Sequence, residues 1–271
     1  MLTIVPQCGL CNRLRVVLSA MAIAQRQHVD VRVLWQQTPE CNAAFTDLFV
    51  PIDSGRLHVT PCPWWARPSR RRNLHWPRLL RLLMGYTRQY DGFVPRSLEQ
   101  LPQETARHRR IYVSSCSQLA AYPPECLRRL QPREALQTRI DSICSTYAAD
   151  TVGVHIRRTD NVQSMQVSTV EAFVEAMQNE INRSPRVRFF LATDDAQVKQ
   201  QLICRFPRRI ITQSVPACRT TLEGMADAVV DLWCLARTRR LLGSYWSSFT
   251  DTAAEIGQIP ITIVGASNHS L

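Results

Sequence analysis

The sequence lacks an uninterrupted apolar run long enough to cross a bilayer as a helix, which takes about 18 residues. Its beginning also lacks the basic segment and the long apolar stretch of a secretion signal, because Pro6 closes the short apolar run 2–5. These absences argue against a helical membrane protein and a secreted one. We therefore expect the chain to stay in the cytoplasm.

Lysine is almost missing too. Lys199 is the only one among 33 basic residues, and arginine supplies the rest of a formal net charge of +11. A positive excess of this size is typical of proteins that bind nucleic acid, an anionic membrane surface or an anionic substrate. Arginine also suits phosphate binding, because its planar guanidinium donates two parallel hydrogen bonds. The charge thus indicates an anionic partner without choosing among the three.

The spacing of a metal site is absent as well, although the chain has ten cysteines. Cys8 and Cys11 form one Cys-x-x-Cys pair, but no second pair and no histidine pair completes a zinc site. The surrounding loop, 7–13, has one glycine where a dinucleotide-binding fingerprint has three. We therefore expect no metal, and thiols buried in ordinary apolar segments.

Two parts of the chain alternate between predicted strands and helices. In the first, a strand at 2–6, a helix at 12–27 and a strand at 29–35 form a βαβ unit. The second part has predicted helices at 133–147, 169–182, 195–206, 221–236 and 248–256, and strands at 152–157, 187–192, 209–212, 240–243 and 261–264. Such alternation predicts an α/β fold with parallel sheets covered on both faces.

The stretch 57–104 between them is rich in proline, tryptophan and arginine and shows no sustained periodicity. We expect an irregular insertion containing a short basic helix at 79–85, followed by a strand at 109–114. Three interpretations of the insertion stay open: peripheral contact with anionic lipid, stacking on an acceptor sugar, or a solvated loop. The residues that would make the membrane contact are Trp64, Trp65, Arg70–Arg72 and Trp76.

Polar residues follow three predicted strands of the second part, at 155–160, 193–195 and 244–250. Ligands bind at the carboxyl ends of the strands in sheets of this kind, so we expect these segments to converge. Arg157 and Arg158 alternate to opposite faces of the chain. One of them would bind an anionic ligand and the other would brace the loop, and we favour Arg157 as the ligand-binding group.

Other residues at these strand ends have both a functional and a structural interpretation. His155 lies on the same side as Arg157 and is either part of a ligand pocket or a satisfied core histidine. Asp160 either braces an arginine or accepts a proton from an acceptor hydroxyl. Asp194 and Asp195 cap the next helix, bind sugar hydroxyls, or divide these tasks.

Ser247 and Ser248 begin a predicted helix, where free N–H groups and hydroxyls suit a phosphate. Together, the segments resemble the ordered motifs of the α1,6-fucosyltransferase and protein O-fucosyltransferase superfamily, which includes the Nod-factor fucosyltransferases. The matching segments are HIRRTD at 155–160, LATDD at 191–195, VDL at 230–232, SSF at 247–249 and, near the beginning of the chain, GLCNRL at 9–14.

The resemblance implies a GT-B fold, in which two Rossmann-like domains face each other across a cleft. Residues 1–148 would form the acceptor side and 149–271 would bind GDP-fucose. The implied reaction is inverting, metal-independent transfer of fucose to a glycan hydroxyl, without a cofactor. Arg157, on the β-phosphate, and Asp160 would be catalytic. The implied GDP-fucose contacts are Asn12, Arg13, His155, Arg158, Asp194, Asp195, Asp231 (on the guanine), Ser247, Ser248 (both on the pyrophosphate) and Phe249.

Two departures from the family pattern matter. Cys11 replaces a glycine, so the first loop must take a conformation that a side chain tolerates. The glutamate that serves core α1,6-type enzymes as a base is missing, since residues 161–165 read NVQSM. A catalytically inactive GDP-sugar-binding protein is therefore one alternative. A nucleic-acid-binding protein is another, given the arginines interleaved with aromatic residues.

Overall fold

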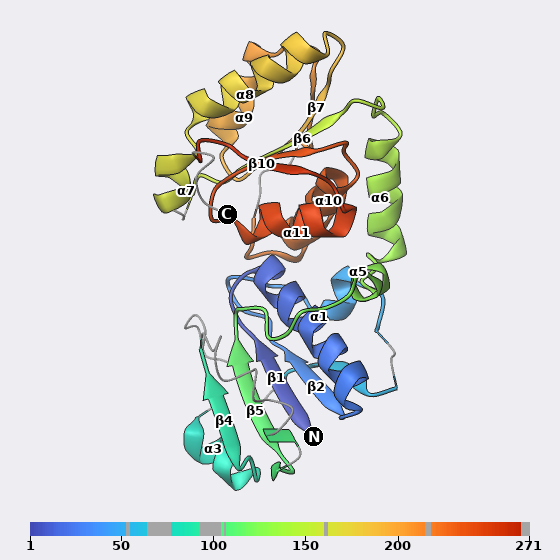
Figure 1. Ribbon diagram of the computed structural model, residues 1–271, viewed down its shortest axis with the longest axis vertical. Helices are drawn as coiled ribbons and strands as arrows, with labels where there is room; N and C mark the ends of the chain where they lie inside the picture. The colour runs from blue at the N-terminus through green and yellow to red at the C-terminus, as the bar shows by residue number, and fades with distance from the viewer. Residues whose placement is uncertain are drawn as a thin grey trace. The chain divides into compact units, whose positions relative to one another are not determined.

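The computed structural model describes residues 1–52, 55–63, 77–92, 104–105, 107–159, 162–214 and 218–266. The chain forms two compact units, the first from Met1–Arg133 with Arg219–Met225 and the second from Glu134–Cys218 with Ala226–Leu271. Each unit contains a parallel five-stranded sheet with helices packed beside it (Figure 1). None of the helices in the described ranges is both long and apolar enough to cross a membrane.

The sheet of the first unit has the strand order β3-β2-β1-β5-β4. All five side chains of the central strand β1 are buried, and the long helix α1 follows it directly. The elements are β1 (Leu2–Pro6), α1 (Leu10–Gln27), β2 (Val31–Trp35), α2 (Phe45–Leu48), β3 (Leu57–Pro61), α3 (Arg78–Leu83), β4 (Arg88–Asp91), β5 (Ile111–Ser115) and α5 (Pro124–Arg129).

The expectation of an irregular stretch at 57–104 is wrong for two segments. Leu57–Pro61 pairs with β2, and Arg88–Asp91 pairs with β5, so that each forms an edge of the first sheet. Both strands have mostly exposed or half-exposed side chains, and therefore carry no apolar run that a sequence pattern could reveal. The tryptophans and arginines at 64–76 lie outside the described residues.

The second unit has the strand order β10-β9-β6-β7-β8. Its central strand β6 is buried throughout, between β7 and β9. The elements are α6 (Glu134–Cys144), β6 (Val152–Ile156), α7 (Val162–Val167), α8 (Val170–Arg183), β7 (Phe189–Thr193), α9 (Ala196–Arg205), β8 (Ile210–Ile211), α10 (Leu222–Ala236), β9 (Leu241–Gly243), α11 (Ser248–Gly257) and β10 (Ile261–Ile263).

Residues of β6 alternate between two helix layers. Val152, Val154 and Ile156 join a buried cluster with side chains of α8 and α9. Gly153 and His155 face the other way, toward the layer that contains α10 and α11 (Figure 1). The last side chain of the strand that faces α11 is thus polar, and it lies where the strand reaches the edge of the sheet.

Candidate active site

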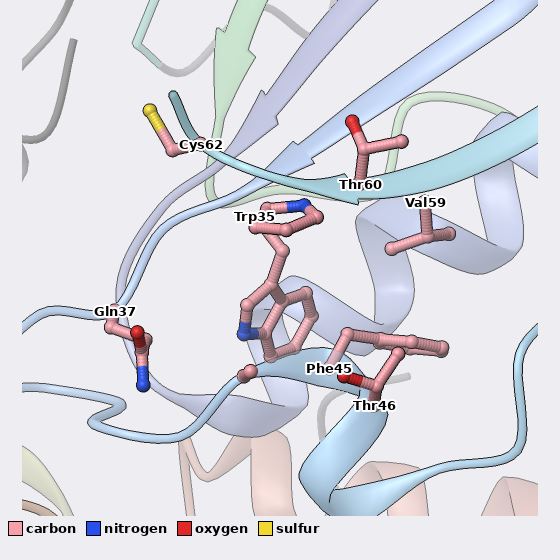
Figure 2. A pocket seen from close by; sticks show the side chains of 9 residues that line it. Trp35, Gln37, Phe45, Thr46, Val59, Thr60 and Cys62 are labelled. Carbon is pink, nitrogen blue, oxygen red and sulfur yellow. The ribbon is translucent and has the colours of Figure 1, made fainter. Parts of the chain in front are cut away.

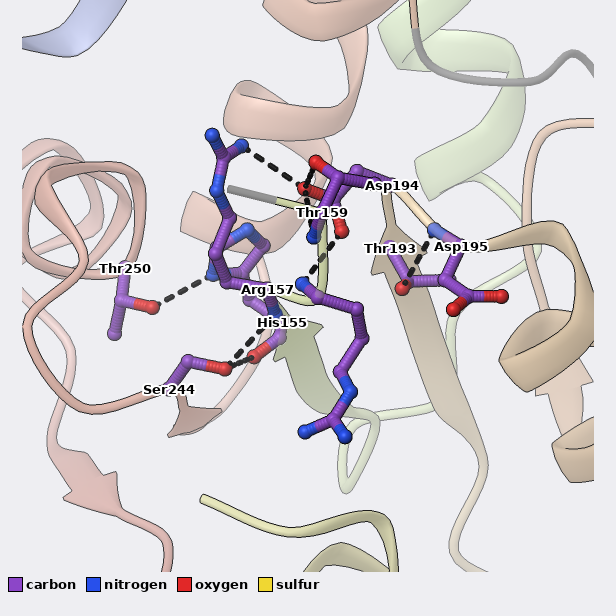
Figure 3. A network of polar contacts seen from close by, with 9 residues as sticks. His155, Arg157, Thr159, Thr193, Asp194, Asp195, Ser244 and Thr250 are labelled. Carbon is purple, nitrogen blue, oxygen red and sulfur yellow. Dashed lines mark hydrogen bonds and ion pairs between the residues drawn. The ribbon is translucent and has the colours of Figure 1, made fainter. Parts of the chain in front are cut away.

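The carboxyl ends of β6, β7 and β9 bring their polar residues together, and Asp194 is the centre of the group (Figure 3). Its carboxylate accepts hydrogen bonds from the backbone N–H of Arg158 at 2.7 Å and from the Thr159 hydroxyl at 2.7 Å. The same carboxylate pairs with the Arg157 guanidinium at 3.1 Å. Asp194 therefore fixes the loop that follows β6 and orients Arg157 at the same time.

The two aspartates after β7 have different tasks. Asp195 is the N-cap of α9, because its Oδ1 accepts from the backbone N–H groups of Gln197 and Val198 at 2.8 and 3.0 Å. Asp194 instead contacts the β6 loop, and its side chain is only 12% exposed.

The two arginines after β6 also differ in what they contact. Arg157 keeps 18% of its side chain exposed while it pairs with Asp194. Arg158 directs its Nη1 to the carbonyl oxygens of Met165 and Ser168, at 3.4 and 3.2 Å, and so braces the chain between α7 and α8. Of the two, Arg157 has its guanidinium at the group of strand-end side chains.

Ser244 follows β9, the strand that pairs with β6 on the side opposite β7, and it makes two hydrogen bonds to the end of β6. Its hydroxyl accepts from the backbone N–H of Arg157 at 2.9 Å and donates to the carbonyl oxygen of His155 at 3.2 Å. Ser244 begins the polar segment 244–250, which the sequence predicts to lie with the other strand ends, but the sequence assigns this serine no contact of its own. The parallel pairing of β6 with β9 gives it this position, and no local motif indicates it.

His155 is buried and held between two residues of α11. Its Nδ1 lies 2.7 Å from the Thr250 hydroxyl, and its ring stacks on Phe249 with a centroid distance of 4.8 Å. Burial lowers the pKa of His155 far below its usual value, and the nearby positive charge of Arg157 adds to this effect. The imidazole is therefore neutral at physiological pH.

The start of α11 can lie close to β9 because Gly243 of this strand has no side chain. A Cβ added there would come within 2.1 Å of the Thr250 Cγ2 atom. Ser247 occupies the N-cap position of α11 without a side-chain capping hydrogen bond, and it is buried. Backbone N–H groups of the first turn and the Ser247 hydroxyl thus lie at one helix end, beside the strand ends.

Asp231 belongs to a second polar group, built from α10 and residues of other elements. The Gln213 amide donates to its Oδ1 at 2.7 Å and also to the carbonyl oxygen of Asp227 at 3.0 Å. Burial raises the pKa of Asp231 to about 7, although Gln213 and then Lys199 act in the opposite direction. Asp231 therefore changes its charge near physiological pH.

Arg139 of α6 completes this group, since it pairs with Asp227 at 2.5 Å and donates to the Gln213 side chain at 2.8 Å. The motifs read from the sequence include none of Arg139, Gln213 and Asp227. Residues that meet from three separate elements have no common spacing along the chain, so only the folded structure reveals them.

In the first unit, Arg13 is buried within its own loop and sheet. Its guanidinium donates to the carbonyl oxygens of Cys8 and Gln36 and to the Thr38 hydroxyl. Asn12, its neighbour in α1, is half-buried. The left-handed residue of this loop is Cys8, with φ 65°, whereas Cys11 lies in α1. Cys11 thus has helical backbone angles that any side chain tolerates, and the left-handed position of the loop is Cys8.

A pocket in the first unit lies at the carboxyl ends of β2 and β3, beside α2 (Figure 2). Aromatic and small polar side chains line it, as Figure 2 shows for Trp35, Phe45 and Thr60.

Asp160 lies outside the described residues. Within the ranges that the structure describes, no cluster of three or more His, Cys, Asp or Glu side chains could hold a metal ion.

A scan against protein-family models found no match, and a search of curated proteins found none either. Solved structures match over almost the whole chain. NodZ α1,6-fucosyltransferase soaked with GDP-fucose is 20% identical, with a TM-score of 0.60 over 96% of this chain and 93% of that one. Fucosyltransferase NodZ from Bradyrhizobium is 22% identical, with a TM-score of 0.58 over 93% and 92%. POFUT1 in complex with GDP is 13% identical, with a TM-score of 0.59 over 98% of each chain.

These likenesses identify the fold. The chain has the α/β architecture of the GT-B fucosyltransferases, with two Rossmann-like units, and the fold class expected from the sequence is confirmed. The assignment of individual site residues stays a prediction.

Proposed function

We propose that this chain is a fucosyltransferase that moves fucose from GDP-fucose to a glycan hydroxyl with inversion and without a metal. The observation that carries the proposal is the end of β6, where Asp194 and Ser244 fix the backbone and Asp194 orients Arg157. A preorganised guanidinium at the carboxyl end of a parallel sheet suits a diphosphate. The shared fold with NodZ and POFUT1 supports the same conclusion, because that NodZ structure was soaked with GDP-fucose and that POFUT1 structure is a complex with GDP.

In the proposed reaction, the bond between the fucose C1 and the β-phosphate oxygen breaks through an oxocarbenium-like transition state. The acceptor oxygen attacks C1 from the opposite face, and GDP leaves with the bonding electrons. Arg157 would stabilise the negative charge that develops on the β-phosphate, since it stays protonated throughout. Asp160 remains the candidate base for the acceptor proton.

The donor would lie on the second unit. The carboxylate of Asp231 suits the N1–H and 2-amino donors of a guanine, and the start of α11 with Ser247 and Ser248 suits the pyrophosphate. A neutral His155 adds no further positive charge and presents a fixed ring beside Arg157. We assign the acceptor to the first unit, and we keep Asn12 and Arg13 of that unit as candidate donor contacts.

Calorimetric titration with GDP, GDP-fucose, GDP-mannose and a UDP-sugar tests the donor assignment. We expect GDP and GDP-fucose to bind and the UDP-sugar to fail, because uracil lacks the paired N1–H and 2-amino donors that we assign to Asp231. A random oligonucleotide at two salt concentrations tests the nucleic-acid alternative, whose affinity would fall steeply with salt. Binding of the oligonucleotide alone would reject the proposal.

Turnover separates the enzyme from an inactive GDP-sugar-binding protein. We expect release of GDP from GDP-fucose in the presence of an acceptor glycan, with unchanged rates in excess chelator. Tight GDP binding without any release, across a panel of glycans, would instead favour the inactive binder, which the missing glutamate at 161–165 allows.

We further propose a cytoplasmic location with peripheral membrane contact. The described residues add one observation to the basic and aromatic stretch at 64–76: Leu79, Leu82 and Leu83 of α3 are 69%, 55% and 78% exposed. Exposed leucines beside arginines are typical of surfaces that contact anionic lipid. Such contact would bring the enzyme to a membrane-bound acceptor.

A further inference from the structure

Two cysteines of the second unit lie side by side without a covalent bond. Cys144 is the last residue of α6 and Cys234 lies in α10, and their sulfur atoms are 3.9 Å apart in a hydrogen bond. Cys144 is half-buried and therefore accessible to a small reagent, whereas Cys234 is fully buried. One thiol of the pair can meet a solute first, and the other can reach only its neighbour.

The surroundings favour the thiolate of Cys144. Its hydrogen bond with Cys234 lowers the pKa of the Cys144 thiol, and the Tyr147 hydroxyl and the positive charge of Arg237 add to this, although burial opposes it. Tyr147 also donates to the carbonyl oxygen of Cys234 at 3.1 Å, and Arg237 pairs with Asp141 at 2.5 Å. The first contact holds the backbone of Cys234, and the second links α6 to the residue that follows α10.

We propose that Cys144 and Cys234 are a peroxide-sensitive thiol pair that forms a reversible disulfide between α6 and α10. In the first step, the Cys144 thiolate attacks hydrogen peroxide, the O–O bond breaks, and sulfenic acid and hydroxide form. In the second, the Cys234 sulfur attacks the sulfenic sulfur, the S–O bond breaks, and the Cys234 proton leaves with the oxygen as water. A thiol such as glutathione reverses the reaction by disulfide exchange.

Exposure alone would select a different cysteine. Cys204 of α9 is the exposed cysteine of the described residues, and its sulfur contacts the Gln200 amide at 3.5 Å rather than a second thiol. Cys8 and Cys116, which follow β1 and β5, also hydrogen-bond to each other and form a competing pair in the first unit. The hydrogen bond with Cys8 lowers the pKa of the Cys116 thiol to about 6, so peptide mapping has to distinguish the two pairs.

The disulfide would join helices that the ion pair of Arg139 with Asp227 already connects, and Arg237, directly after α10, also pairs with Asp141 of α6. The sulfur atoms need to approach by about 2 Å to reach bonding distance. Because the cross-link closes a loop of 90 residues, it restricts the unfolded chain strongly. We expect the oxidised protein to unfold at a temperature higher by a few degrees.

The experiment treats the whole protein with a small excess of hydrogen peroxide near neutral pH, blocks the remaining thiols and maps the peptides by mass spectrometry. Wild type and the control Cys204→Ser should both give a 144–234 cross-linked peptide that lacks two hydrogen atoms, with a raised unfolding temperature. Cys144→Ser should keep Cys234 reduced. Cys234→Ala should stop at a sulfenic acid on Cys144 that dimedone traps.

Three results would overturn the proposal. The first is oxidation of Cys204 while both members of the pair stay reduced, and the second is a cross-link found only between Cys8 and Cys116. The third is a 144–234 peptide from wild type that glutathione does not cleave. Should Cys234→Ala unfold, dimedone labelling of wild type at early times gives the same information about Cys144.

Discussion

Two neighbouring arginines at the end of β6 make different contacts, although only one residue of chain separates them. Arg158 donates to two carbonyl oxygens of the chain, so its guanidinium is committed to the fold. Arg157 contacts a carboxylate and keeps part of its side chain exposed. Strand alternation predicted that the two would differ and favoured Arg157 for the ligand, and the structure adds that Arg158 contacts the carbonyl oxygens of Met165 and Ser168.

Arg157→Ala should leave a folded protein with turnover reduced by roughly 10²–10³, the usual effect of removing one preorganised donor to a developing charge. The fold survives because Asp194 still accepts from the backbone of Arg158 and from Thr159. Steady-state kinetics with GDP-fucose and circular dichroism measure the two effects. The matched control is Arg186→Ala, an exposed arginine of the same unit. Equal activity of the two variants would remove Arg157 from the mechanism.

Asp231 should make stability depend on pH. Its pKa is about 4 in an unfolded chain and about 7 in the folded protein, so the protonated form favours folding. This contribution is complete below pH 4 and is lost as the pH rises to 7, at a cost of at most about 4 kcal/mol. Asp231→Asn does not titrate, and it should therefore gain stability relative to wild type between pH 5 and 8.

Urea denaturation at several pH values measures this difference, with the exposed surface residue Asp30 changed to Asn as the control. Identical pH dependence in wild type and Asp231→Asn would contradict the prediction. In wild type, GDP should also bind more weakly below pH 7, because a guanine that donates hydrogen bonds needs the ionised carboxylate.

The close packing of α11 against β9 determines where Thr250 meets His155. Gly243→Ala would place a Cβ within 2.1 Å of Thr250 Cγ2, and the resulting displacement should destabilise the protein by about 1–3 kcal/mol. Thr250 also holds His155 Nδ1, so GDP-fucose binding should weaken as well. Denaturation curves and calorimetry give the two values.

Thr250→Ser separates the clash from the hydrogen bond, since it deletes Cγ2 and keeps the hydroxyl. Gly243→Ala combined with Thr250→Ser should therefore recover part of the stability that Gly243→Ala loses. A double variant whose free energy of unfolding is no higher than that of Gly243→Ala would show that the clash does not depend on this methyl group.

The sequence predicted the buried elements well and the edge strands poorly. β1 and β6 are apolar and buried on both faces, so their patterns identify them. β3 and β4 lie at sheet edges with half-exposed side chains, and short helices such as α2 carry too few residues to establish a period. Hydrophobic periodicity arises where one face of an element is buried, so elements that bury few side chains show little periodicity.

The sequence likewise predicted one part of the candidate site and not another. The convergence of His155, Arg157 and Asp194 follows from parallel strands that end at one edge, which alternation along the chain predicts. The supporting contacts of Ser244 and Gln213 depend on which strands are neighbours and on loop conformation. Those properties are set by long-range packing, so no local spacing encodes them.

For the whole molecule, the charge of +11 and the exposed leucines of α3 lead to one prediction about membranes. Arg78, Arg88 and Arg110 are exposed on or near this helix, and each arginine near an anionic surface contributes about 1 kcal/mol to binding. Replacing Leu79, Leu82 and Leu83 together by serine removes apolar contact without touching the core. We expect wild type to co-sediment with anionic vesicles and this variant to remain largely in the supernatant.

Neutral vesicles and high salt distinguish the two contributions. Arginine attraction alone would survive the serine substitutions and disappear in salt, because screening shortens its range. Insertion of the leucines would make binding of wild type to anionic vesicles partly resistant to salt. Val162→Ser, an apolar side chain 60% exposed in the other unit, is the matched control and should pellet like wild type. Equal pelleting of the triple variant and this control would reject a role for α3 at the membrane and leave the charge as the only source of attraction.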